Sequence, residues 1–309
     1  MSDPAPAAER PPSQVAAWLL ASRPKTLPAA IVPVVAGCAL VHELTGNYSL
    51  YLAVLTLVAA IAIQIATNFY NDVLDADKGA DTAARKGPAR MISSGRLSRK
   101  AVMGAALGVL VVAAICGGLL IHERGWIVLA IGLPSLYLSY GYTGGPFPLA
   151  YLGLGELFVI LFFGLVAVGG TVFVQTGELL SGSLVLGLQI GFLSAILIGV
   201  NNYRDVAEDA AAGKNTLAVR LGRPLFGGIL LAMVFAVPTL FFGYEQALFD
   251  RWVVWWIGSM VLAFWHFNLI GLRLVSTGFR GDFPNAFLGL SALHLVLFMV
   301  FQLVAYSLT

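Results

Sequence analysis

Long apolar segments recur along this chain, and short polar stretches separate them. Each segment holds about twenty residues, the length that an α-helix needs to cross the hydrocarbon core of a bilayer. Lipid cannot satisfy the backbone groups of an open strand edge, so every segment is expected to be a helix. The pattern predicts an all-α, polytopic membrane protein with nine transmembrane helices. The predicted spans are residues 15–41, 49–70, 101–121, 126–142, 155–176, 183–202, 224–243, 252–275 and 284–308.

Composition indicates the same class of protein. Hydrophobic residues make up 59% of the 309 residues and charged residues only 11%, whereas soluble domains have about 45–50% apolar and about 25% charged residues. Such a chain buries its apolar surface in lipid, and we expect one transmembrane domain over residues 14–309 with no nucleic-acid partner. Residues 1–13 are rich in Pro and Ala and are expected to form a disordered cytoplasmic tail. Cys38 and Cys116 lie within apolar segments and are interpreted as packing residues.

The Lys and Arg residues predict the orientation, because cytoplasmic loops of membrane proteins carry an excess of positive charge. If the N-terminus is cytoplasmic, sixteen of the eighteen Lys and Arg residues lie on that side. Only Arg124 and Arg251 lie on the other side. This distribution predicts a cytoplasmic N-terminus.

Aspartates crowd at the end of the second segment, in NFYNDVLDADKGADTAARKGPAR (residues 68–90). Asn71 and Asp75 are one helical turn apart and share a face to within about 40°, and Gly79 is suited to ending the helix and turning the chain back. Such crowding requires a compensating cation, and the arrangement can direct oxygen ligands at hard divalent ions. Four of the sixteen acidic residues of the chain lie here: Asp72, Asp75, Asp77 and Asp81.

Magnesium is the expected ion, because it favours a few carboxylates shared with substrate phosphates over a closed protein cage. Basic residues within and directly after the acidic cluster can hold the remaining phosphate charge. They are Lys78, Arg85, Lys86 and Arg90. The stretch therefore predicts a Mg-diphosphate site at a membrane surface, and on the orientation above it lies on the cytoplasmic side.

The chain repeats this stretch at the end of the sixth segment, in NNYRDVAEDAAAGKNTLAVR (residues 201–220). An isolated acidic cluster is usually a solvated turn, but the duplication disfavours that interpretation. Four helices separate the copies, so both have the same orientation in the membrane and relate by an axis along its normal. We expect two parallel pseudo-repeats that face each other across one substrate. The second copy contains Asn201, Asp205 and Asp209 at the same spacing, followed by Gly213, Lys214 and Arg220.

Polar side chains also lie within the second segment. Asn68 continues a row from Gln64 toward Asp72, each four residues from the next. Buried polar residues in a span usually face protein or a cavity. Asn68 therefore either lines a substrate pocket or joins two helices by a hydrogen bond.

The first segment contains three prolines, Pro24, Pro28 and Pro33, which predict a kinked or locally opened helix. Arg23 and Lys25 flank the first of them. These two cations either anchor the helix at the interface, which is their commoner role, or contact a substrate phosphate.

A Gly- and Pro-rich connection, SYGYTGGPFPLAYLGLGELF, follows the fourth segment on the same side as both aspartate stretches. Its tyrosines, among them Tyr142 and Tyr151, are either interfacial belt residues or the lining of an aromatic pocket that accommodates positive charge. Glu156 begins the next segment and is a further pocket candidate. His266 and His294, in the last two segments, are interpreted as packing residues.

The two aspartate stretches resemble the two aspartate-rich signatures of the UbiA-type intramembrane prenyltransferases, and the resemblance covers nearly the whole chain. Within that family the chain is most similar to the members that prenylate 1,4-dihydroxy-2-naphthoate. The similarity is carried by RPKTLPAAIVPV, KGADTAARKGPAR, YTGGPFPLAYLGLGELFVILFFGLVAVGGT and NNYRDVAEDAAAGKNTLAVRLG.

The resemblance implies a helical bundle around a membrane-embedded cavity and two Mg²⁺ ions bound through a diphosphate. The implied reaction transfers a polyprenyl chain to the aromatic acid with loss of its carboxylate, giving demethylmenaquinol in menaquinone biosynthesis. The implied location is the bacterial cytoplasmic membrane. The implied catalytic residues are Asn71, Asp75, Asp81, Asn201, Asp205 and Asp209, and the implied metal ligands are Asp72, Asp75, Asp81, Asp205 and Asp209.

Some details stay open at this stage. Asp77 has no counterpart in the family pattern, and we expect it to pair with Lys78 or Arg85. Homogentisate and 4-hydroxybenzoate are alternative acceptors for the same reaction type. An ion-coupled transporter is the alternative from another class, but its acids would lie near the midplane of the membrane on broken helices rather than beside phosphate-binding cations.

Overall fold

The computed structural model describes residues 13–79, 90–244, 252–277 and 286–307, and it contains no strand within these ranges. The elements are α1 (Gln14–Ala21), η1 (Pro24–Thr26), α2 (Pro28–Thr45), α3 (Leu50–Asp77), α4 (Arg99–Arg124), α5 (Ile127–Gly141), η2 (Leu149–Tyr151), α6 (Gly155–Val159), η3 (Ile160–Val166), α7 (Ala167–Thr176), α8 (Ser181–Arg204), α9 (Val206–Ala211), α10 (Leu217–Tyr244), α11 (Trp252–Ser276) and α12 (Ala286–Ser307).

Eight helical stretches of the described chain are long and apolar enough to cross a membrane. They are Pro28–Thr45, Leu50–Asp77, Arg99–Arg124, Gly155–Thr176, Gly182–Arg204, Leu217–Leu240, Trp256–Leu274 and Ala286–Ser307. The fourth predicted span corresponds to α5, a shorter apolar helix of 15 residues. The all-α polytopic class is confirmed, and the count of nine becomes eight long helices and this shorter one.

The first predicted span is broken rather than continuous. Arg23 has left-handed backbone angles (φ 51°, ψ 68°) between α1 and η1. Pro24 and Pro28 each stand at the start of a helix, where a residue without an N–H group loses no hydrogen bond. The opening that the prolines predict therefore lies at the N-terminal end of α2, beside the aspartates at the end of α3.

The second span is longer than its apolar pattern. α3 has 28 residues and is about 42 Å long, whereas the hydrocarbon core is about 30 Å thick. The helix continues through the first aspartates and ends at Gly79, which adopts a positive φ of 65°. Asp72 and Asp75 therefore project from the last turns of a rigid helix and not from a loop.

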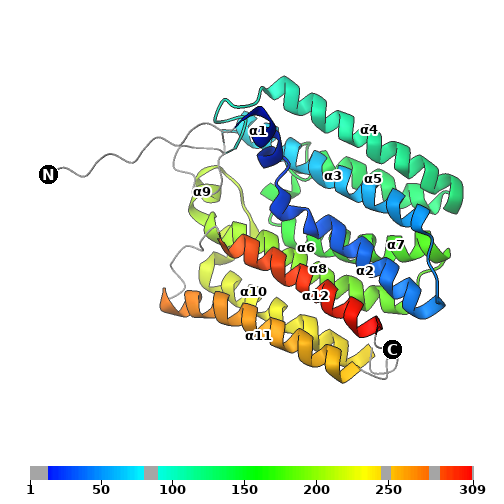
Figure 1. Cartoon of the computed structure of the whole chain (residues 1–309). Helices are drawn as coiled ribbons and strands as arrows, with labels where there is room; N and C mark the ends of the chain where they lie inside the picture. The colour runs from blue at the N-terminus through cyan, green and yellow to red at the C-terminus, as the bar shows by residue number, and fades with distance from the viewer. Residues whose placement is uncertain (1–12, 80–89, 245–251, 278–285, 308–309) are drawn as a thin grey trace.

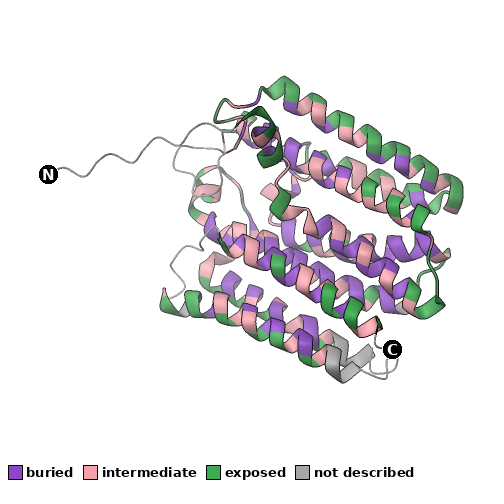
Figure 2. Ribbon diagram, viewed as in Figure 1, coloured by how far each residue is buried: buried purple, intermediate pink, exposed green. Residues whose placement is uncertain are grey.

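The bundle has a buried centre and a lipid-facing rim (Figure 2). In α8, 72% of the membrane window is buried, against 22% in α3 and in α4. Backbones approach most closely where the π-helical segment η3 meets α8, since a Cβ on Gly164 would collide with the backbones of Gly187 and Gly191. α3 and α8 end at the same end of the bundle, which also carries α1 and α9 (Figure 1). Both aspartate stretches therefore lie at that end.

Candidate active site

Asp75 is the point where three separate parts of the chain meet. Its side chain is buried, and Oδ2 accepts a hydrogen bond from Arg90 at 2.9 Å. Lys214, which follows the second aspartate stretch, lies 2.9 Å from Oδ1. The Tyr151 hydroxyl donates to the same oxygen at 3.2 Å. The first acidic stretch thus binds cations from its own loop and from the second stretch.

Asp72 lies one turn earlier on the same helix and is buried as well. Its Oδ2 accepts a hydrogen bond from the backbone N–H of Met91 at 3.2 Å, and Arg90 lies 4.0 Å from Oδ1. Oδ1 has no hydrogen-bond partner among the described residues. The charge of Arg23 acts on this carboxylate from the break before α2.

Two lysines lie against the ring of Tyr151, whose centroid is 3.8 Å from Lys78 Nζ and 5.1 Å from Lys214 Nζ. Lys78 donates to the backbone carbonyl of Thr143 at 2.6 Å, and the Thr143 hydroxyl donates to Asn71. Burial lowers the pKa of Lys78, Asp75 opposes that shift, and the charge of Lys214 adds to it. The loop after α5 therefore positions the cations at the end of α3.

The second stretch is organised locally. Asp205 caps the end of α8 and is bound by the neighbouring Arg204, with Nε 2.5 Å from Oδ1 and Nη2 2.7 Å from Oδ2. Arg223 donates to the carbonyls of Tyr203 and Arg204 at 3.3 and 3.2 Å. The Asn201 carbonyl accepts from the Asp205 N–H at 2.9 Å. This network holds the end of α8 against α10.

Asp209 lies in the short helix α9 and is half-buried. Its N–H donates to the Asp205 carbonyl at 2.8 Å, and its own carbonyl accepts from the Lys214 N–H at 2.8 Å. The Asn215 N–H donates to the Tyr151 carbonyl at 3.2 Å. The loop after α9 is therefore fixed to the connection that follows α5, which brings Lys214 to Asp75.

Glu156 lies at the start of α6 and is buried. Its Oε1 accepts a hydrogen bond from Asn202 at 2.7 Å, and Oε2 has no partner among the described residues. Tyr142 lies beside Gly155, since a Cβ there would approach the Tyr142 hydroxyl to 2.9 Å. Tyr142 therefore lies next to the start of α6, beside Glu156.

The polar row on α3 bonds to the broken first span. Asn68 Nδ2 donates to the carbonyl of Ser22 at 2.8 Å and to the hydroxyl of Thr26 at 3.0 Å. Gln64 Nε2 donates to the same hydroxyl at 3.2 Å. Asn68 thus makes the helix-joining hydrogen bonds of the second interpretation, whereas Gln64 also lines the cavity described next.

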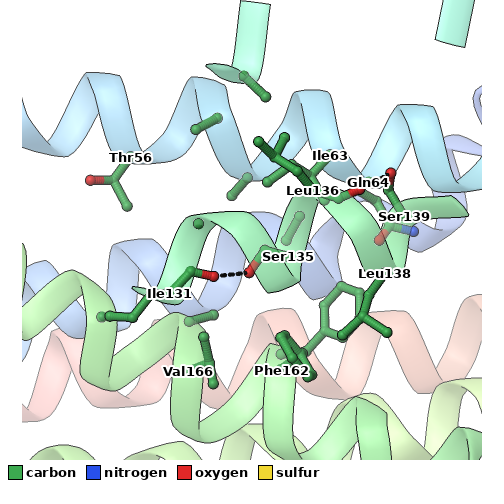
Figure 3. Close-up of a pocket in the computed structure, with 18 of the residues that line it drawn as sticks. Thr56, Ile63, Gln64, Ile131, Ser135, Leu136, Leu138, Ser139, Phe162 and Val166 are labelled. Carbon is green, nitrogen blue, oxygen red and sulfur yellow. Dashed lines mark hydrogen bonds between the residues drawn. The ribbon is translucent and has the colours of Figure 1, made fainter. Parts of the chain in front are cut away.

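A cavity of about 230 Å³ extends from Tyr142 and Leu149 into the interior of the helix bundle, away from the aspartates. Its walls come from α2, α3, α4, α5 and the α6–η3–α7 helix (Figure 3). Figure 3 shows Gln64 and Ser139 at one end and Thr56 at the other, along α3 and α5. Phe158 and Phe162 stack with their centroids 6.0 Å apart and form part of the wall. The lining is almost wholly apolar, so the space suits a hydrocarbon chain.

The predicted residues fall into three groups. Asn71, Asp72, Asp75, Lys78, Arg90, Tyr151 and Lys214 come together around one centre, with Tyr142, Glu156 and Asp209 nearby. Lys25 and Arg220 have exposed side chains, and Arg220 donates to the Asn215 carbonyl at 3.1 Å. Asp81, Arg85 and Lys86 lie outside the described residues.

Asp77 was expected to pair with Lys78 or Arg85. In the described chain it does not pair with Lys78, and Arg85 lies outside the described residues. Asp77 forms a bidentate ion pair with Arg99 at 2.8 to 3.1 Å, which joins the end of α3 to the start of α4. The sequence reasoning also missed Thr143, Asn202 and Arg204. Arg204 precedes an aspartate of the motif directly, and that adjacency was the one available signal.

Residues 30–278 match the UbiA prenyltransferase family. The chain is 37% identical over 212 residues to the 1,4-dihydroxy-2-naphthoate octaprenyltransferase of Haemophilus influenzae, covering 66% of this chain and 69% of that protein. It is 39% identical over 220 residues to the enzyme of the same name from Mycobacterium tuberculosis, covering 70% of this chain and 74% of that one. The solved structure of a UbiA homolog from Archaeoglobus fulgidus bound to GPP and Mg²⁺ has a TM-score of 0.64 at 17% identity, covering 94% of this chain and 99% of that one.

Proposed function

Because this chain belongs to the UbiA prenyltransferase family, we propose that it transfers a polyprenyl group from an allylic diphosphate to 1,4-dihydroxy-2-naphthoate, with loss of the ring carboxylate. The observation that carries this proposal is the junction of a cation cluster around the buried Asp75 with an apolar cavity at Tyr142. A polyprenyl diphosphate has the same two parts, a highly charged head and a hydrocarbon tail. The product would be demethylmenaquinol.

The cation cluster carries most of the affinity in this proposal. A tail that moves from lipid into an apolar cavity leaves one hydrocarbon environment for another, so it gains little from the hydrophobic effect. Binding then depends on the head, which Lys78, Arg90 and Lys214 can hold by charge-assisted hydrogen bonds. Their fixed charges also stabilise the departing diphosphate.

The buried carboxylates fit a hard divalent cation such as Mg²⁺. Asp72 Oδ1 has no hydrogen-bond partner in the described chain, and both oxygens of Asp75 already hold positive groups. Within the described ranges no three acidic, His or Cys side chains form a complete metal site. In this proposal the ions are shared with the substrate phosphates. Asp72, Asp75, Asp205 and Asp209 would hold Mg²⁺, as would Asp81 beyond the described ranges. We propose two such ions; bound there, they would supply Lewis-acid neutralisation of the leaving diphosphate.

The cavity protects the allylic carbon while its bond to diphosphate weakens. Apolar walls exclude water, which would otherwise capture the developing allyl cation. The two hydroxyl groups of the acceptor make its ring electron-rich, so the carbon that bears the carboxylate can attack. Loss of carbon dioxide then restores the aromatic ring.

A competition between acceptors tests the proposed substrate. Purified protein receives Mg²⁺, a polyprenyl diphosphate and equal amounts of dihydroxynaphthoate, homogentisate and 4-hydroxybenzoate, and products are identified by mass. The expected product is mainly the decarboxylated prenyl-naphthalenediol. Prenylated 4-hydroxybenzoate that keeps its carboxylate, with the naphthoate untouched, would refute the acceptor and leave the enzyme class standing.

We further propose that both aspartate stretches face the cytoplasm of a bacterial cell, because the positive charges gather on that side. The native thiols Cys38 and Cys116 are buried, so single cysteines can be added without a strong background. A cysteine at Ala84 should react with an impermeant thiol reagent only from the cytoplasmic side, and one at Glu178 only from outside. The reverse labelling would overturn the orientation.

A further inference from the structure

Glu156 is a buried acid for which the transfer of a prenyl group, as described above, has no use. It is 2% exposed, and no Lys or Arg of the described chain forms an ion pair with it. Burying a carboxylate without a cation costs several kcal/mol, and among the described residues only Asn202 forms a hydrogen bond with it, through Oε1. An ionisable group kept within a membrane bundle at this cost points to a function.

The position of Glu156 indicates which step of the reaction it serves. Gly155, the residue before Glu156, packs against Tyr142, because a Cβ on Gly155 would approach the Tyr142 hydroxyl to 2.9 Å. Tyr142 lines the head of the cavity. Phe158 and Val159, two and three residues after Glu156 on the same helix, line the cavity wall. Glu156 does not itself line the cavity, but it lies directly behind the cavity head at Tyr142, where the acceptor ring would meet the allylic carbon. The Asn202 hydrogen bond fixes Oε1, whereas Oε2 is buried without a hydrogen-bond partner in the described chain.

We propose that Glu156 is a catalytic residue that takes the proton from the acceptor hydroxyl next to the attacked carbon, and that Asn202 is the residue that positions it. The inference rests on the proposed function, because it names the base of that same reaction. A ring hydroxyl must lose its proton as its oxygen becomes a carbonyl. A neighbouring carboxylate without a cation is suited to receive it.

The O–H proton passes to Oε2 while its bonding pair forms the ring C=O bond. The ring π pair forms the new C–C bond to the allylic carbon, and the allylic C–O bond breaks with its electron pair leaving on the diphosphate. Carbon dioxide then departs, its C–C pair returns to the ring, and the resulting enolate oxygen takes the proton back from Glu156. The carboxylate is regenerated, and no oxidant or reductant is needed.

The test compares Glu156→Gln with the wild type, using whichever acceptor the wild type prenylates. Glutamine keeps the size of the side chain and can still accept from Asn202, but it cannot take a proton. We expect kcat to fall about 10²- to 10⁴-fold, with the KM for polyprenyl diphosphate unchanged within about twofold. An acceptor with a fluorine on its distal ring has a more acidic hydroxyl, so the ratio of variant to wild-type rate should rise several-fold with it.

Controls separate this role from a structural one. Gln302→Leu removes another buried polar side chain, on α12 and remote from the site, and should keep wild-type kcat. Glu156→Asp retains a proton acceptor, so it should recover part of the lost rate and serves as the second variant if the glutamine protein is not monodisperse. A kcat of Glu156→Gln above about one third of the wild-type value would overturn the role of Glu156. The role would also be overturned if Glu156→Asp lost as much activity as Glu156→Gln and the fluorinated acceptor recovered none of that loss. A wild type that prenylates no acceptor would instead refute the proposed function.

Discussion

The two aspartate stretches are alike in sequence and different in structure. Asp75 of the first receives Arg90, Lys214 and Tyr151, which come from three places in the chain. Asp205 of the second is bound by Arg204, its immediate neighbour. Asp75 therefore depends on tertiary assembly, whereas Asp205 is bound within its own turn in the described part of the chain.

This difference indicates that the duplicated motif does not make two equivalent half-sites. Lys214 belongs to the second stretch but binds the acid of the first. The second stretch thus supplies a cation across the gap, whereas its own Asp205 is neutralised locally. The arrangement of the chain as two parallel pseudo-repeats stays a prediction. The two aspartate stretches nevertheless pair their acids with cations in different ways. The following substitutions test how far this difference affects function.

The largest effect is expected for Asp75→Ala. The change removes the carboxylate at which Arg90, Lys214 and the Tyr151 hydroxyl meet. The proposed metal then loses a ligand, and the cations that would hold the diphosphate lose the group that positions them. We expect kcat/KM for polyprenyl diphosphate to fall at least about 10³-fold, by analogy with the removal of a charge-stabilising group from an active site. Steady-state turnover in detergent with saturating Mg²⁺ measures it, beside size-exclusion profiles that confirm folding. Full activity of this variant would remove the central claim.

Arg204→Gln should act mainly on stability. Arg204 and Asp205 are both buried, and breaking such a pair by removing one partner costs about 3–5 kcal/mol. We expect the free energy of unfolding to fall by roughly this amount without ligand, and much less with Mg²⁺ and diphosphate present, because these would neutralise Asp205 instead. Thermal melts in detergent with and without the two ligands measure both values. An equal loss under both conditions would show that the second stretch does not bind them.

Much of the fold could be predicted from the length of the apolar segments, because about twenty apolar residues suffice for a transmembrane helix. The end of α3 could not: the hydropathy signal stops at residue 70, but Asp72 and Asp75 remain helical since they are buried against the loop at Met91 and against Arg90. Spacing alone placed Asn71 and Asp75 correctly on one helix. The partners of those residues depend on which loops pack beside the helix, and no local pattern records that.

The cation assignments illustrate the same limit. Sequence proximity suggested Lys78 as a partner of Asp77, yet Lys78 turns to the carbonyl of Thr143, whereas Asp77 meets Arg99 across a 22-residue separation. Arg220 follows the second stretch in sequence, but its side chain is exposed. A count of nearby charges predicts that a phosphate site exists. It cannot predict which charges the fold turns inward.

Lys214→Ala should have an intermediate effect. It removes one charge-assisted contact between the two stretches, and such a hydrogen bond contributes about 1.5–3 kcal/mol. We expect the KM for polyprenyl diphosphate to rise by about 10- to 100-fold, as that free energy implies, with a smaller change in kcat. The matched control is Lys100→Ala, an exposed lysine at the start of α4, which should leave both constants at wild-type values. Equal effects of the two variants would mean that only the overall surface charge matters.

Asp77→Ala should have the smallest effect, although Asp77 lies only two residues from Asp75 and would be ranked with the other aspartates by sequence alone. Its carboxylate faces Arg99 on the outside of the bundle, with 38% of the Asp77 side chain and 54% of the Arg99 side chain exposed. Water screens a pair that is this open, so its loss should change kcat/KM by no more than about twofold. Arg99→Ala removes the same contact from the other side and should match it in the same turnover assay. A loss for Asp77→Ala comparable to that of Asp75→Ala, without a loss for Arg99→Ala, would mean that Asp77 turns inward to the metal when substrate binds. In that case the local pairing seen here would describe only the substrate-free enzyme, and the first stretch would contribute one more ligand than its buried side chains indicate.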